Sequence, residues 1–90
     1  TMLVRKGGKE VDLTPTEFRL LAVLAASPGR VFSREELIAH ALGPDFTGFD
    51  RTVDAHVKNL RQKIETDPRN PRYILTVHGL GYRFQAEEGP

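Results

Sequence analysis

Residues 51–64, which read RTVDAHVKNLRQKI, constrain the fold more than any other stretch, because apolar side chains recur there at helical spacing. At about 100° per residue, four of them fall within one narrow sector: Val53, Val57, Leu60 and Ile64. The opposite side is small, polar or basic and centres on Arg51, Ala55, Lys58, Asn59 and Gln62. The pattern predicts a helix over about residues 51–66 that buries one side and leaves the other to solvent or to a large anionic partner.

The basic residues gather around this segment. The whole chain carries a net charge of only +1, and residues 1–50 hold six Lys or Arg against seven Asp or Glu. Residues 51–83 hold seven Lys or Arg against three Asp or Glu, a net of +4. Such an excess supports an anionic partner without establishing one, because many amphipathic helices simply expose a solvated charged face.

The polar side of the predicted helix suits the major groove of duplex DNA. Arg and Lys neutralise phosphates, and the amide of Asn59 can pair with adenine. The small Ala55 permits a close approach of the helix and can meet a thymine methyl group. From the residues alone, DNA binding and a solvated surface both remain open.

The start of the chain predicts a hairpin and a first helix. The segment MLVRKGGKEVDL reads as two short strands around Gly7-Gly8. Thr14 and Glu17 form a capping box, which opens a helix to about Ala26, and Pro28-Gly29 ends it. The expected inward stripe of this helix is Phe18, Leu21, Ala22 and Ala25.

A second helix follows a brief extended link at Val31-Phe32. Ser33 and Glu36 form another capping box, so the helix is expected to run through about Leu42. Its expected inward residues are Leu37, Ile38 and Ala41. The segment GPDFTGFD reads as a loop, after which Asp50 can cap the next helix.

The end of the chain predicts a second hairpin, over about residues 73–85, with a turn at His78-Gly79-Leu80-Gly81. His78 can reach a minor groove, whose negative potential attracts cationic side chains, or it merely occupies an exposed turn. Tyr82 and Phe84 alternate with Arg83, and this alternation favours core positions for the two aromatic residues. Tyr82 can also contact DNA. Residues 86–90 are expected to form a tail.

The predicted order is therefore hairpin, three helices, hairpin. This order indicates the α+β class and a winged helix-turn-helix, with short N-terminal antiparallel strands and a C-terminal β-hairpin wing. Ninety residues suit one domain, so residues 1–90 are expected to form a single unit.

Other classes of protein find little support. The chain has no cysteine, which excludes disulfides and thiolate chemistry. Its three histidines lie far apart without a nucleophile motif, and Asp54 is expected to pair with Lys58 at i,i+4. No apolar run reaches the roughly 18 residues of a membrane span, and no signal peptide is evident. The sequence predicts no enzyme, no cofactor, no metal and no membrane partner, and a cytoplasmic location.

Three segments closely resemble the effector domain of OmpR/PhoB-type bacterial response regulators: LTPTEFRLLAVLAASPGRVFSREELIAHALG, DRTVDAHVKNLRQKIE and YILTVHGLGYRF. The resemblance runs from about Val11 to Phe84. It implies a winged-helix domain that binds double-stranded DNA and acts as the transcriptional output of a two-component system. It also implies a phosphoacceptor receiver domain and a linker in the full protein, which residues 1–90 do not include.

The resemblance implies DNA contacts along residues 51–61, which match the family's major-groove helix. The implied contacts are to the DNA backbone at the helix start (Arg51, Thr52), to base edges (Ala55, His56, Asn59) and to phosphates or bases (Lys58, Arg61). In the wing, Thr76 and Tyr82 match positions that contact the DNA backbone, and His78 with Gly79 forms the tip.

Three positions depart from the family pattern. His78 stands where Arg is common, so its minor-groove contact is expected to be weaker and pH-dependent, because a free imidazole titrates near pH 6.5. Asn59 stands where Arg is frequent, which shifts the implied base preference. Leu42 replaces a frequent Trp, which puts a DNA-backbone contact there in doubt.

The resemblance also implies protein partners. The loop over residues 43–50 matches a segment that engages RNA polymerase in several relatives, and its Phe46 and Phe49 either point outward or tuck under the next helix. A second copy of the domain is expected head to tail on direct-repeat half-sites. The alternative function is a winged helix that acts mainly through protein–protein contacts, which would favour an apolar patch on the polar face of residues 51–64.

Overall fold

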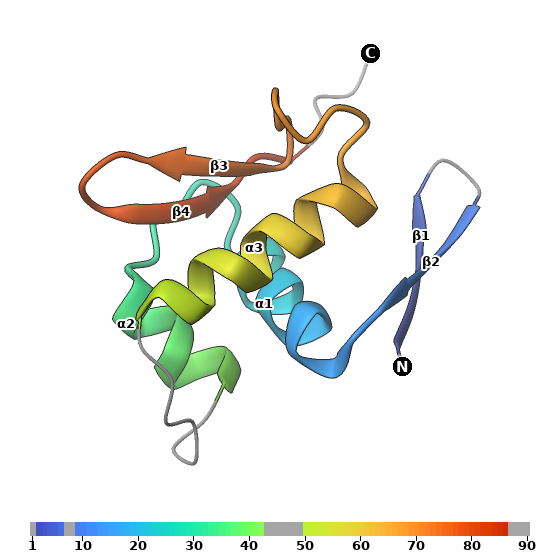
Figure 1. The fold of residues 1–90 in the computed structure, drawn as a ribbon. Helices are drawn as coiled ribbons and strands as arrows, with labels where there is room; N and C mark the ends of the chain where they lie inside the picture. The colour runs from blue at the N-terminus through green and yellow to red at the C-terminus, as the bar shows by residue number, and fades with distance from the viewer. Residues whose placement is uncertain (1, 7–8, 43–49, 87–90) are drawn as a thin grey trace.

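The computed structural model describes residues 2–6, 9–42 and 50–86, and side chains within 10–41 and 53–86. Two antiparallel hairpins flank the helices (Figure 1). The elements are β1 (Met2–Lys6), β2 (Lys9–Leu13), α1 (Pro15–Ala26), α2 (Arg34–Leu37), η1 (Ile38–Leu42), α3 (Asp50–Ile64), β3 (Ile74–Val77) and β4 (Gly81–Phe84). The predicted α+β order of hairpin, helices and hairpin is confirmed.

The helix α1 begins as predicted but is rotated relative to the expected stripe. Its capping box is present, with the Thr14 hydroxyl accepting from the Glu17 backbone N–H at 3.2 Å and the Glu17 carboxylate accepting from the Thr14 N–H at 2.9 Å. The buried line consists of Glu17, Leu20 and Leu24, whereas Ala22 is exposed. The predicted stripe is right only in part: Phe18 and Leu21 are half-buried and pack against the core, whereas Ala22 is exposed. FRLLAVLAA is apolar almost all round, so its periodicity does not fix which side faces inward.

The second helix consists of a short α-helical turn, α2, that continues into the wider π-helical turn η1. The predicted capping box opens it, with the Ser33 hydroxyl accepting from the Glu36 N–H at 3.1 Å. Leu37 and Ala41 are buried, as expected, and Ile38 is half-buried. The switch to π geometry was not predicted from the apolar spacing.

The helix α3 forms the centre of the fold. Val53, Val57 and Leu60 are completely buried and Ile64 nearly so, which confirms the predicted apolar side. Asp50 is the first residue of the helix rather than the residue before it, and the helix ends at Ile64, two residues earlier than expected. Its apolar side packs with Leu20 and Leu24 of α1 and Leu37 of α2 into one core.

The wing is wider than a two-stranded hairpin. In the register of β3 and β4, Ile74 pairs with Phe84 and Val77 with Gly81. The expected extended link adds one isolated β-bridge, in which the Phe32 N–H donates to the Tyr82 carbonyl at 2.8 Å and the Tyr82 N–H donates to the Phe32 carbonyl at 3.0 Å. The connection between α1 and α2 is thereby tied to the outer edge of β4.

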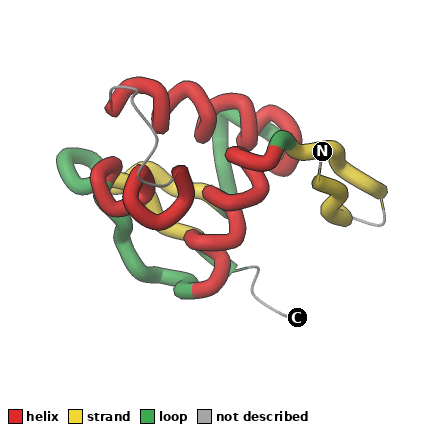
Figure 2. The backbone as a smooth tube through the Cα atoms, turned by 90° about the horizontal axis from the view of Figure 1, so that it is seen from below, coloured by secondary structure: helices red, strands yellow, loops and turns green. Residues whose placement is uncertain are grey.

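The N-terminal hairpin projects from the helices, as Figure 2 shows from below. Strands β1 and β2 form the predicted antiparallel pair, in which Met2 lies opposite Leu13 and Lys6 opposite Lys9. Leu13, at the end of β2, is completely buried and enters the core. The predicted turn at Gly7-Gly8 lies outside the described residues.

Gly81 permits the close contact between Phe32 and β4. It adopts φ +150°, and a Cβ atom there would lie 2.0 Å from the Phe32 carbonyl oxygen. Gly79, with φ +78° and open space around it, provides a matched control.

We expect Gly79→Ala to lower the free energy of unfolding by about 1–2 kcal/mol through backbone strain alone. Gly81→Ala should cost about 1–3 kcal/mol more, because the methyl group also forces two backbones apart. Urea denaturation of both variants measures the difference. Equal losses would contradict the close approach of the Phe32 backbone to Gly81.

Candidate nucleic-acid interface

The described side chains on the outer face of α3 have few contacts within the protein. Ala55, Lys58, Asn59 and Gln62 are exposed, and His56 is half-buried. Within the described part of the chain, the side chains of Lys58, Asn59 and Gln62 make no hydrogen bond. Arg51 and Thr52 lie in the first turn of α3, but their side chains are outside the described ones. The helix thus presents an ammonium group and two amides to an external ligand.

Lys63, by contrast, turns toward α1. Its ammonium lies 2.6 Å from the carboxylate of Glu17, whose side chain is only 4% exposed. Burial raises the pKa of Glu17, but the hydrogen bonds from Lys63 and Thr14 and the charge of Lys63 together hold that pKa below its ordinary value. The pair joins α3 to α1 across 46 residues of sequence.

Arg61 lies between α3 and the wing. Its Nε and Nη2 donate to the Ile74 carbonyl at 3.0 and 2.7 Å, and Nη2 also donates to the Thr76 hydroxyl at 2.9 Å. The guanidinium carbon lies 5.5 Å from the centre of the Tyr82 ring. Arg61 and Thr76, both expected to contact DNA, therefore bind each other and position the wing; their contact with DNA stays a prediction.

Asp54 joins three elements. Its Oδ1 accepts from Arg34 Nε at 2.7 Å and from the Tyr82 hydroxyl at 2.5 Å, so α2, α3 and β4 meet at one carboxylate. The predicted pair with Lys58 is wrong, because Asp54 faces the seam between α2 and the wing. Burial raises the pKa of Asp54, but the hydrogen bonds from Arg34 and Tyr82 lower it below its ordinary value.

Glu65 holds the base of the wing, and no expectation from the sequence included it. Its carboxylate, in a residue that is 4% exposed, accepts from the backbone N–H groups of Arg72 at 2.8 Å, Tyr73 at 3.1 Å and Ile74 at 2.9 Å. The only signal in the sequence is an acidic residue directly after an amphipathic helix, which does not differ from an ordinary surface residue.

The wing tip is exposed at His78, Gly79 and Leu80. Leu80 is 61% exposed, and no pattern in the sequence marked it. Tyr82 is buried, which confirms its core position, and half-buried Phe84 stacks on Tyr73 with ring centres 6.2 Å apart. Direct contact of Tyr82 with DNA is therefore limited by its burial.

Some expectations fall on residues that the structure does not describe. Phe46 and Phe49, in the loop expected to meet RNA polymerase, are among them, and so is the side chain of Leu42. Among the described residues, no helix has the length and apolar character needed to cross a bilayer. The same residues contain no group of three or more His, Cys, Asp or Glu that could hold a metal ion.

The Asp54 contacts predict a pH dependence. Because its pKa is lower in the folded state than its ordinary 3.8, the stability that it contributes is complete above that value and is lost as the pH falls through the folded pKa. Asp54→Asn should therefore reduce the loss of unfolding free energy that the wild type shows at acidic pH. The effect should be modest, because the side chain of Asp54 is 41% exposed.

Thermal unfolding between about pH 7 and about pH 2 measures this effect. Asp12→Asn is the matched control, because Asp12 is exposed and makes no side-chain hydrogen bond within the described part. An Asp54→Asn variant with the same acid limb as the wild type and the control would contradict the account.

Comparison with known proteins places this arrangement in a family. Residues 8–84 match the family model described as "Transcriptional regulatory protein, C terminal". The transcriptional regulatory protein BaeR of Escherichia coli is 49% identical over 80 residues, which are 89% of this chain and 33% of BaeR. The chain thus spans about a third of that relative's length.

Two solved structures resemble the fold. The response regulator DrrB, an OmpR/PhoB homologue of Thermotoga maritima, superposes with a TM-score of 0.80 at 39% identity over 88% of this chain and 36% of DrrB. The AdeR DNA-binding domain, solved in complex with an intercistronic region, gives 0.79 at 32% identity over 97% of this chain and 88% of that domain. The chain belongs to the family of C-terminal domains of transcriptional regulatory proteins, which are the OmpR/PhoB-type winged helices that its sequence resembles.

Proposed function

We propose that the chain is the DNA-binding output domain of a bacterial two-component response regulator and binds double-stranded DNA sequence-specifically to control transcription. The observation that carries this proposal is the outer face of α3, where Lys58, Asn59 and Gln62 are exposed and have no partner among the described residues. An ammonium group and two amides on one helix face are the kinds of groups that contact phosphates and base edges.

The helix α3 enters the major groove in this proposal. Ala55 lets it approach closely, His56 and Asn59 lie toward base edges, and Lys58 meets a phosphate. Arg51 and Thr52, at the helix start, contact the DNA backbone. AdeR, whose DNA-binding domain superposes on this chain, is bound to an intercistronic region, which supports the assignment.

The wing meets the flanking minor groove in this proposal. His78 and Gly79 form its exposed tip, and Arg61 holds Thr76 in place beside α3. Thr76 is exposed and can still meet a phosphate through its hydroxyl, while the hydroxyl of Tyr82 is directed to Asp54. The wing's contribution is thus concentrated at its tip and at Thr76.

We infer the rest of the protein from its relatives. A chain that spans about a third of BaeR fits the output domain of a longer regulator with a receiver domain and a linker, acting in the cytoplasm. Binding of two copies to direct-repeat half-sites and contact of residues 43–50 with RNA polymerase belong to the same proposal. A catalytic activity has no support, because the family consists of transcriptional regulators.

The alternative, docking of another protein on α3, is less well supported. It requires an apolar patch there, and among the described residues the large hydrophobic side chain that is exposed, Leu80, lies in the wing turn. The face of α3 offers instead an ammonium group and two amides.

Two substitutions on adjacent residues of α3 test base reading. Asn59→Ala should cost about 1–3 kcal/mol of binding on the preferred duplex and almost nothing on scrambled DNA, because a base contact is sequence-dependent. Lys58→Ala should weaken binding to both duplexes by the same factor, because a phosphate contact does not depend on the base sequence. Fluorescence anisotropy titrations measure both, and an equal loss on the two duplexes for Asn59→Ala would rule out its base-reading role.

A further inference from the structure

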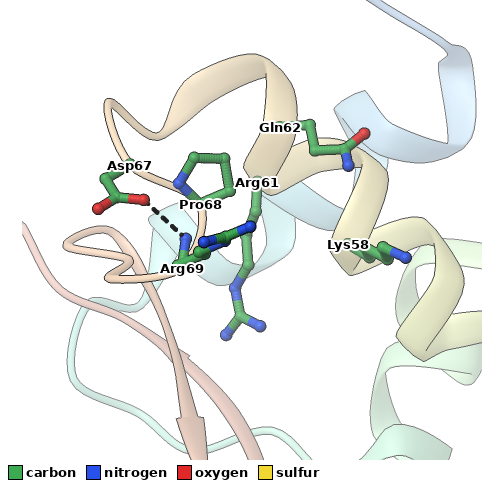
Figure 3. A pocket seen from close by; sticks show the side chains of 6 residues that line it. All are labelled: Lys58, Arg61, Gln62, Asp67, Pro68 and Arg69. Carbon is green, nitrogen blue, oxygen red and sulfur yellow. Dashed lines mark hydrogen bonds between the residues drawn. The ribbon is translucent and has the colours of Figure 1, made fainter.

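An open hollow of about 520 Å³ lies between the second half of α3 and the turn that follows it. Its lining comprises Lys58, Arg61, Gln62, Asp67, Pro68 and Arg69 (Figure 3). Three of these residues belong to α3, and three belong to the turn on the way to the wing. We call it the α3-turn hollow, and Arg69 has no role in the interface described above.

The turn itself is held in place by Asp67. Its carboxylate accepts from the Arg69 backbone N–H at 3.1 Å and from the Asn70 side-chain amide at 3.0 Å. These two bonds, the one from Asn70 first, lower the pKa of Asp67. The carboxylate is thus engaged by its own turn, and the Arg69 side chain lies beside Arg61 in the hollow (Figure 3).

The hollow carries an excess of positive charge. Its lining holds three basic residues, Lys58, Arg61 and Arg69, and one acidic residue, Asp67. Arg61 donates to a carbonyl and a hydroxyl, which are both neutral groups. In the part of the chain that the structure describes, none of Lys58, Arg61 and Arg69 forms a salt bridge. Several cations around one open hollow give it a positive potential, which attracts an anion.

We propose that the α3-turn hollow binds a phosphate of the DNA backbone, with Arg69 as the main cation and Lys58 as its partner on α3. This rests on the proposed DNA binding and extends the contact surface beyond the helix to the turn after it. The occupant is a phosphodiester of duplex DNA, because the hollow is open and shares Lys58 with the outer face of α3, along which a DNA strand would run. Gln62 can donate a further hydrogen bond from the hollow's edge.

A phosphate contact predicts a change in salt dependence. On a mixed-sequence duplex of about 30 base pairs, Arg69→Gln should reduce the slope of log K against log[salt] by about 0.9, the value for one phosphate. Affinity should fall severalfold and by the same factor on preferred and scrambled DNA. Arg69→Lys, which keeps the charge, should retain the wild-type slope.

Arg72→Gln is the matched control. Arg72 follows three residues later, is exposed and does not line the hollow, so the same charge change there should alter the slope much less. Arg69 is also exposed and its backbone N–H remains available to Asp67, so both variants should unfold at the temperature of the wild type.

The outcomes separate this proposal from the DNA binding on which it rests. If the wild type binds with a steep salt slope and the slopes of Arg69→Gln and Arg72→Gln are equal, phosphate binding in the α3-turn hollow is rejected. The proposed DNA binding of the domain would then still stand. A base-dependent loss for Arg69→Gln would also overturn a phosphate contact. A folded wild type that binds no duplex would reject both.

Discussion

The buried carboxylate of Glu65 is the constraint on which the interface depends. It accepts three consecutive backbone N–H groups, at residues 72–74, directly after the helix that presents the polar face. A hydrogen bond to a charged group stabilises by about 1.5–3 kcal/mol, and a buried donor left without its acceptor costs a similar amount. One carboxylate therefore joins the end of α3 to the start of β3, and Arg61 extends this connection to Ile74 and Thr76.

The side chains of α3 divide according to what they contact. The apolar side belongs to the core. The side chains that flank it contact other elements of the protein: Lys63 contacts α1, Asp54 contacts α2 and β4, and Arg61 contacts the wing. Among the described side chains of α3, those of the outer face remain for an external ligand. A helix held on three sides presents that face in a fixed orientation, which reduces the ordering cost of binding and favours sequence-specific contacts over loose electrostatic attraction.

Local chemistry made much of the fold predictable, and long-range pairing set the limit. Two capping boxes, two hairpins and the apolar side of α3 follow from residues at most a few positions apart, and all are present. The partners of Asp54 lie 20 and 28 residues away, and that of Lys63 lies 46 away, so spacing along the sequence could not identify them. The rotation of α1 escaped prediction because nearly every residue in its centre is apolar. The exposed face of α3 was predictable, whereas the internal role of Arg61 and the burial of Glu65 needed the tertiary structure.

The most direct test of the account is selection from a random duplex library with the 90-residue chain, at about 150 mM salt, where non-specific attraction is largely screened. The account predicts enrichment of one short half-site, alone or as two direct repeats about one helical turn apart. A folded chain that enriches no sequence would contradict sequence-specific reading by α3. If it also failed to bind any duplex, the outer face would have to serve a protein partner instead.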